Sequence, residues 1–215
     1  MQEAQWMKSH NAVAMLESLP EEPGDRKLRL FACACYRHFE DRLNDGPFSE
    51  AVETAEAFAE GKSSKAALKR VRQSVRAVRH ALSSASTDDR VEWVALWLAE
   101  VAASENAFGG VADEIQRFVS EGVLQPNEQP PTASLLRCII GNPFQSVAID
   151  SRWRTSEVVT LAQSIYDHAA FDRLPQLAEA LKNVGCHDTD MLKHCRSKGP
   201  HVRGCCVVDQ VLGKS

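Results

Sequence analysis

Apolar residues recur every three or four positions along most of the chain, which is the spacing of one face of an α-helix. Val91, Val94, Leu98 and Val101 show this spacing in the segment 90–108. Short breaks separate the periodic segments, for example at Gly61 and at Gly109-Gly110. The pattern predicts an all-α protein, a compact bundle-like array of about nine to eleven helices.

The clearest boundary in the pattern is the segment VLQPNEQPP, residues 123–131, which has three prolines in nine residues. Proline and the residue before it favour an extended backbone, so this segment predicts an exposed connection. It separates an N-terminal helical half, residues 1–122, from a C-terminal helical half, residues 132–215. We expect the two halves to pack as one unit.

Composition narrows the class of protein. The 215 residues are 44% hydrophobic and 25% charged, with a formal net charge of -4 and a pI near 6.0. This acidic balance gives no overall field that attracts nucleic acid or an anionic membrane. The N-terminus has no signal-peptide pattern, and no apolar run reaches the roughly 18 residues of a membrane span. The seven cysteines are an odd number, so we expect reduced thiols in a soluble cytoplasmic protein.

One segment is strongly basic, with seven lysines or arginines and no acidic residue between positions 62 and 79. Five of them recur at helical spacing: Lys65, Lys69, Arg72, Arg76 and Arg79. Such a stripe is typical of a helix that contacts phosphates of DNA or RNA. It is equally typical of a helix that folds back on an acidic neighbour, and the preceding segment supplies Glu50, Glu53, Glu56 and Glu60. We favour the second interpretation and expect a protein partner, because the chain is acidic and no aromatic residue interleaves the cations.

The segment with the most potential metal-binding and catalytic side chains is HCRSKGPHVRGCC, residues 194–206, which holds two histidines and three cysteines. Asp190 and His194 are four residues apart in one expected helix, and His201 and Cys205 are four apart in a second helix that starts near Pro200. Two helices that meet at this corner would bring together Asp190, His194, His201 and Cys205. Mixed nitrogen, sulfur and oxygen ligands suit zinc, which is therefore the candidate cofactor.

Two other interpretations of this segment stay open. The first is a structural corner, in which Gly199-Pro200 turns the chain, His201 begins the last helix and Cys205 faces the core; we favour this one. The second is a nucleophilic cysteine, Cys205 or Cys195, with a histidine as base and Asp190 or Asp209 as the group that orients it. The spacing lacks the paired cysteines of common zinc motifs.

Several stretches together resemble a known family. They are DRKLRLFACAC (25–35), LLRCIIGNPF (135–144), WRTSEVVTLAQSIYD (153–167), FDRLPQLAEALKNVGC (171–186) and HCRSKGPHVRGCCVVDQVLGK (194–214). They resemble a paralogue-rich family of uncharacterised bacterial proteins whose members tend to end in HCR..GPHVRGCWVVDxxLGK. The chain departs from that ending at Cys206, where tryptophan is common. The resemblance implies one integral unit, and it implies no activity.

No phosphate-binding loop, dinucleotide fingerprint or hydrolase elbow occurs in the sequence. The leading hypothesis for function is therefore a non-enzymatic helical interaction or scaffold module. The alternative is a metal-binding or thiol-based enzyme that uses the C-terminal histidine, cysteine and aspartate cluster.

Overall fold

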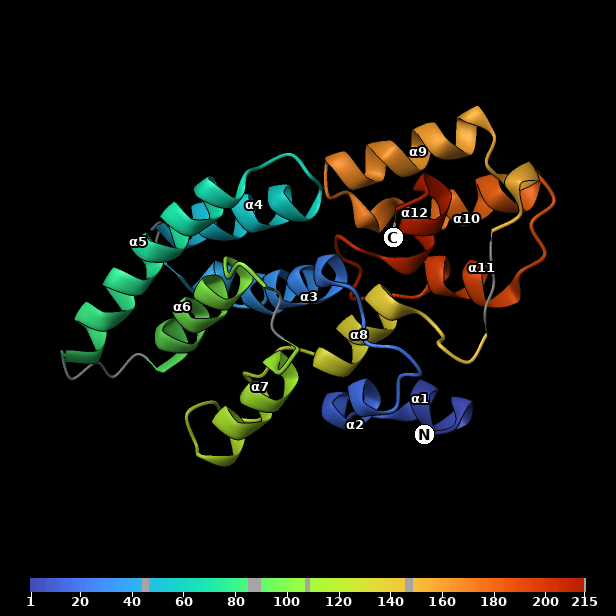
Figure 1. The fold of residues 1–215 in the computed structure, drawn as a ribbon. Coiled ribbons are helices and arrows are strands. Elements are labelled where there is room, and N and C mark those ends of the chain that lie inside the picture. Colours follow the sequence, from blue (N-terminus) through green and yellow to red (C-terminus); the bar gives the residue numbers. More distant parts are fainter. Residues whose placement is uncertain (44–46, 85–89, 107–108, 146–148, 215) are drawn as a thin grey trace.

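The computed structural model describes residues 1–43, 47–84, 90–106, 109–145 and 149–214, and the prediction of an all-α fold is confirmed (Figure 1). The described residues form twelve α-helices and three short 3₁₀ helices, and no strand. Two of the twelve, α1 and α2, have only six residues each, too few for a clear periodic signal. The α-helices are α1 (Glu3–Lys8), α2 (Ala12–Glu17), α3 (Asp25–Arg37), α4 (Pro47–Ala59), α5 (Lys65–Ser84), α6 (Arg90–Ala102), α7 (Val111–Ser120), α8 (Thr132–Ile140), α9 (Ser156–Asp167), α10 (Leu174–Asn183), α11 (Thr189–Arg196) and α12 (Cys206–Leu212). The 3₁₀ helices are η1 (Glu40–Arg42), η2 (Ser151–Trp153) and η3 (Phe171–Arg173).

Helix α3 lies at the centre of the molecule and packs against α4, α6 and α8. Every residue from Leu28 to Tyr36 is buried, as expected of a helix that is covered on all sides. The run includes Arg29, whose guanidinium donates to the carbonyl groups of Ala102 at 2.6 Å and Ser104 at 2.7 Å. The buried cation thereby satisfies carbonyl groups at the end of α6 that have no partner within the helix.

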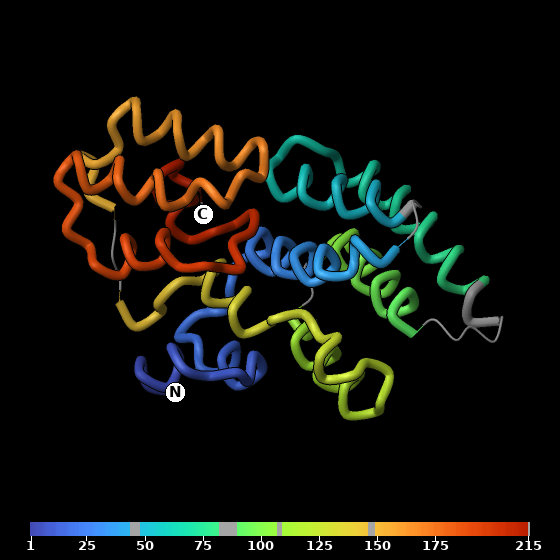
Figure 2. The backbone as a smooth tube through the Cα atoms, turned by 180° about the vertical axis from the view of Figure 1, so that it is seen from behind, coloured from blue at the N-terminus to red at the C-terminus, as the bar shows by residue number. Residues whose placement is uncertain are grey.

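Two hydrophobic clusters make up the core of the described residues. The first is built by helices α1 to α8, and the second by α9 to α12 together with Cys138. Helix α8 belongs to both, because Leu135, Leu136 and Ile139 pack into the first cluster while Cys138 faces the second. Figures 1 and 2 show α8 between α1 and α2 on one side and the C-terminal segment on the other. The boundary between the clusters therefore runs through a helix.

The proline-rich segment 123–131 has no helix, and Gln125, Pro126 and Asn127 are exposed as expected. Leu124 and Pro130 are buried, so the segment is also anchored at both ends. Helix α8, which follows it, packs largely with the N-terminal helices. Residues 123–131 thus separate two parts of the sequence. The boundary between the two hydrophobic clusters lies further along the chain, in α8.

Helices α4 and α5 pack against each other, as the hairpin interpretation expected. Among the described residues, however, the ion pairs of α4 and its C-terminal end lead elsewhere: Glu56 pairs with Arg37 and Arg203, and Glu60 with Arg26 and Lys214. The expectation of acidic and basic stripes that neutralise each other is therefore wrong. Apolar residues of both helices contribute to the core, and Glu56 and Glu60 each link α3 to the C-terminal part of the chain.

The last helix begins later than the sequence predicts. We expected it to start near Pro200 and to include His201, but α12 begins at Cys206 and residues 197–205 form a loop. Gly199 and Gly204 have φ angles of 83° and 86°, a left-handed conformation that a right-handed helix cannot contain.

The described helices include none that combines the length and the apolar character needed to cross a membrane.

Candidate metal centre

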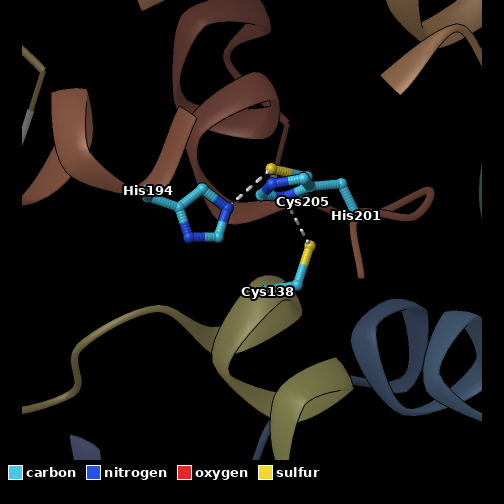
Figure 3. Close-up of side chains that lie close together, drawn as sticks. All are labelled: Cys138, His194, His201 and Cys205. Atoms are coloured by element: carbon cyan, nitrogen blue, oxygen red, sulfur yellow. Dashed lines mark hydrogen bonds between the residues drawn. The ribbon is translucent and has the colours of Figure 1, made fainter. Parts of the chain in front are cut away.

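Four side chains with metal-binding atoms meet where α8, α11 and the loop before α12 come together (Figure 3). Cys138 extends from α8, His194 from the last turn of α11, and His201 and Cys205 from the loop. One ligand atom of each residue lies within 4.8 Å of the ligand atoms of the other three. Three separate segments of the chain therefore converge on one point.

The spacing of the atoms suits a tetrahedral ion. His194 Nε2 lies 3.3 Å from Cys205 Sγ, and His201 Nδ1 lies 3.9 Å from Cys138 Sγ. Zinc bonds of about 2.3 Å to sulfur and 2.0–2.1 Å to nitrogen place the two ligand atoms about 3.6 Å apart. These two distances lie on either side of that value, and a separation near the 4.8 Å limit of the group would have to shorten by about 1 Å for all four atoms to bind one zinc ion.

The orientation of His201 is set from outside the cluster by Ser197. His201 Nε2 lies 3.1 Å from the Ser197 carbonyl oxygen, and the Ser197 hydroxyl donates to the His194 carbonyl at 2.8 Å. A ring that donates its Nε2 hydrogen to a carbonyl leaves the lone pair of Nδ1 directed at the cluster. Carbonyl partners of this kind are a common support for metal-binding histidines.

The loop that carries His201 and Cys205 is held on the body of the protein by Lys27 of α3. Its ammonium group donates to the carbonyl groups of Ile139 in α8 at 3.1 Å and Gly204 in the loop at 2.9 Å, and also pairs with Asp209. A side chain at Gly204 would meet Leu30, because a Cβ atom there would lie 2.9 Å from Leu30 Cδ1. The lysine and the glycine together fix the loop close to α8.

The four groups also alter each other's protonation. Hydrogen bonds with Cys138, Cys206 and the two histidines hold the pKa of Cys205 well below the usual value of a thiol, although burial opposes this. The same contact with Cys205, together with burial, raises the pKa of Cys138. Burial alone would lower the pKa of His201, but its hydrogen bonds with Cys205 and the Ser197 carbonyl raise it. Several hydrogen-bond donors therefore share the thiolate of Cys205. A metal cation can take the place of those donors.

The structure brings together three of the four residues proposed from the sequence, His194, His201 and Cys205. Asp190 is not in the cluster: it is exposed in the first turn of α11, one helical turn before His194, whereas the loop returns to the last turn. Cys138 takes its place. It lies 56 positions before His194 in an apolar helix, and its only sequence signal is that it is a cysteine.

Of the residues in the nucleophile interpretation, Cys205 and the two histidines meet in the cluster, but Cys195, Asp190 and Asp209 do not join them. Cys195 is buried in the second hydrophobic cluster, next to His194 in sequence but outside the group of metal-binding atoms. Asp209 binds Arg26 and Lys27, so it does not orient a histidine. Cys205 does face the core, as the structural-corner interpretation expected, and its side chain is fully buried.

The basic stripe of α5 is only partly available for binding. Lys65, Lys69 and Arg76 are exposed and Arg72 is half-buried. Arg79 pairs with Glu100 of α6 at 2.8 Å, and its guanidinium lies over the ring of Trp93. Four of the five cations therefore form no ion pair within the described part of the chain.

All seven cysteines are buried and none is in a disulfide. No protein-family model, curated protein or solved structure matches the chain.

Proposed function

We propose that the protein binds one zinc ion through Cys138, His194, His201 and Cys205, and that this ion joins α8 to the C-terminal helices. The observation that carries the proposal is the convergence of four ligand atoms within 4.8 Å from three separate segments. Two thiol and two imidazole groups form a ligand set that zinc takes in structural sites, where all four positions belong to the protein. Softer and harder metal ions bind this mixture of ligands less well, because copper(I) favours more sulfur ligands and magnesium favours oxygen ligands.

The role that this ligand set supports is structural. Four protein ligands complete a tetrahedral site and leave no position for a substrate or an activated water. Cys205 has no exposed surface, which also argues against its acting as a nucleophile on an external substrate. The proposed function is therefore that of a non-enzymatic helical binding module whose C-terminal part is held in place by zinc. Its unpaired cysteines suit a reducing compartment such as the cytoplasm.

For the partner we propose a protein in preference to a nucleic acid. Arg79 is engaged by Glu100, and the stripe on α5 has no phenylalanine, tyrosine or tryptophan on which a base could stack.

Zinc binding is tested by metal analysis of protein purified without a histidine tag, combined with melting in the presence of a chelator. We expect about one equivalent of zinc. Chelation should lower Tm by about 10 °C or more, because metal binding contributes directly to folding and each kcal/mol shifts Tm by roughly 2–4 °C at this size.

The matched variants are Cys138→Ala and Cys195→Ala, which each remove one buried thiol of equal size. Only the first should lose zinc and sensitivity to the chelator. The proposal would be refuted if protein from cells grown with added zinc carried no metal and melted identically with and without chelator. Equal zinc content in the two variants would refute the assignment of Cys138.

A further inference from the structure

A pocket of about 600 Å³ opens beside the proposed zinc site, between α8, α11 and α12. Cys138, His194 and His201 contribute to its wall. Its apolar lining residues include Met7, Ile140, Met191 and Val207. A cavity of this size, with an apolar wall and a few polar groups, has the character of a site for a small organic molecule.

A guanidinium without an acidic partner lies in this wall. Arg137 of α8 donates from Nη1 to the carbonyl groups of Trp6 at 3.0 Å and Ser9 at 2.8 Å, which fixes the position of the group. It forms no ion pair with any described residue, and burial lowers its pKa. Its Nε and Nη2 make no hydrogen bond within the described chain, so the fork of the guanidinium is available to an oxyanion.

Two more polar groups complete the pocket. Lys193 of α11 is exposed at its edge and, within the described residues, pairs with no carboxylate. Gln210 of α12 contributes an Oε1 atom that is buried and has no hydrogen-bond partner in the described structure. A buried acceptor without a donor destabilises the folded protein, and a ligand N–H or O–H group that met this atom after a rotation of the Gln210 side chain would remove that penalty.

The acidic residues in the wall do not cancel these cations. Asp188 caps α11 and accepts hydrogen bonds from the backbone N–H groups of Asp190 and Met191. Asp190 is exposed to solvent. Neither carboxylate lies within ion-pair distance of Arg137 or Lys193 in the described structure.

We propose that this pocket binds a small organic anion with three features: an apolar body, an oxyanion that Arg137 and Lys193 hold, and an N–H or O–H group that donates to Gln210 Oε1. This goes beyond zinc binding, since none of the three polar residues is a proposed zinc ligand. The zinc would fix the wall that His194 and His201 form.

The probe is 8-anilino-1-naphthalenesulfonate, a fluorescent molecule that has an aromatic body, a sulfonate and an N–H group. Titration into the full chain, with the zinc content of each sample measured, should give one saturable site. Lys193→Glu should weaken binding about tenfold, and Gln210→Leu should weaken it about threefold although it makes the wall more apolar. The matched control is Lys182→Glu, a charge reversal on the exposed side of α10 outside the pocket, which should leave affinity unchanged. Circular dichroism and melting confirm that each variant is folded.

Competition identifies the part of the probe that is recognised. Benzoate and phenyl phosphate should displace it, and benzyl alcohol should not; the ratio of the two anions distinguishes a carboxylate from a phosphate ligand. The proposal is overturned by non-saturable binding, by equal effects of Lys193→Glu and Lys182→Glu, by tighter binding to Gln210→Leu, or by equal competition from benzyl alcohol. If the pocket proposal fails in this way while the same samples contain close to one equivalent of zinc, the zinc proposal still stands.

Discussion

At the scale of single residues, two features of the loop 197–205 position the metal-binding side chains. His201 turns its Nδ1 toward Cys138 because its other nitrogen is held by Ser197. Cys205 reaches the same point because Gly204 lets the backbone approach Leu30 of α3. The glycine is needed both for its positive φ angle and for its lack of a side chain.

These two requirements of Gly204 can be measured separately. Gly185 has the same φ angle of 86°, but a Cβ atom there would meet nothing within 4 Å. Gly185→Ala should therefore cost only the strain of the left-handed conformation, about 1 kcal/mol. Gly204→Ala should cost a further 1–3 kcal/mol or so, because Leu30 must also move. Denaturant unfolding of the two variants measures the difference, and equal losses would show that the loop tolerates the contact.

Sequence reasoning found the metal-binding residues that lie close together in the chain and missed the one that does not. His194, His201 and Cys205 fall within twelve positions, so their proximity needs no knowledge of the fold. Cys138 joins them only through the packing of α8 against the C-terminal segment. The four-residue spacing of His201 and Cys205 predicted that both lie on a helix, whereas a turn that includes Gly204 brings them together in the loop.

At the scale of elements, apolar periodicity predicted the longer helices well, because burial of one face gives each of them a repeating signal. Charge periodicity was less informative. Glu56 and Glu60 recur with the acidic stripe of α4, but they bind Arg203 and Lys214 from the far end of the chain. Which cation a glutamate meets depends on how helices are arranged, and that arrangement cannot be obtained from spacing within one helix.

Glu60 gives this part of the structure a dependence on pH. Burial alone would raise its pKa, but hydrogen bonds from Lys214 and Tyr166 and the charge of Arg26 lower it. A carboxyl group whose pKa is lower in the folded state stabilises the fold above its unfolded pKa, near 4.3, and loses this effect as pH falls through the folded value. Wild-type protein should therefore lose stability steeply below about pH 5.

The variant Glu60→Gln should be less stable at pH 7 by about 2–4 kcal/mol, because it leaves half-buried Lys214 without its ion-pair partner and removes one of the two carboxylates that bind Arg26. Its stability should also fall less steeply than that of wild type between about pH 5 and 3. The control is Glu53→Gln, an exposed change on α4, the helix that ends just before Glu60; it should follow the wild-type curve. Urea unfolding across this pH range checks both points, and parallel curves for Glu60→Gln and wild type would contradict the assignment.

At the scale of the whole molecule, many contacts cross between the first 122 residues and the last 84. Trp6 donates to the Gly141 carbonyl, Arg137 donates to the carbonyl groups of Trp6 and Ser9, and Arg26 binds Asp209. None of these contacts involves a residue of the segment 123–131 that links the two halves. The linking segment itself has exposed residues at its centre.

Cleavage within 125–129 should therefore leave the two fragments associated. A protease site placed there and cut in the folded protein should give two fragments that elute together and unfold in one transition. Fragments that separate in buffer, or two separate transitions in the intact chain, would contradict the prediction of a single packed unit.

The place of α12 has a consequence for how the protein is made. Arg26 and Asp209 are 183 positions apart, which at about 5–20 residues per second is roughly 10 to 40 s of synthesis. During that interval Arg26 and Lys27 lack their aspartate, Glu60 lacks Lys214, and Cys138 lacks the three residues that complete its cluster. The nascent chain thus carries incomplete ion pairs and an uncovered side of α8 until α12 emerges. A message cut short before α12 yields a product that cannot complete its core and is a target for chaperones and proteases.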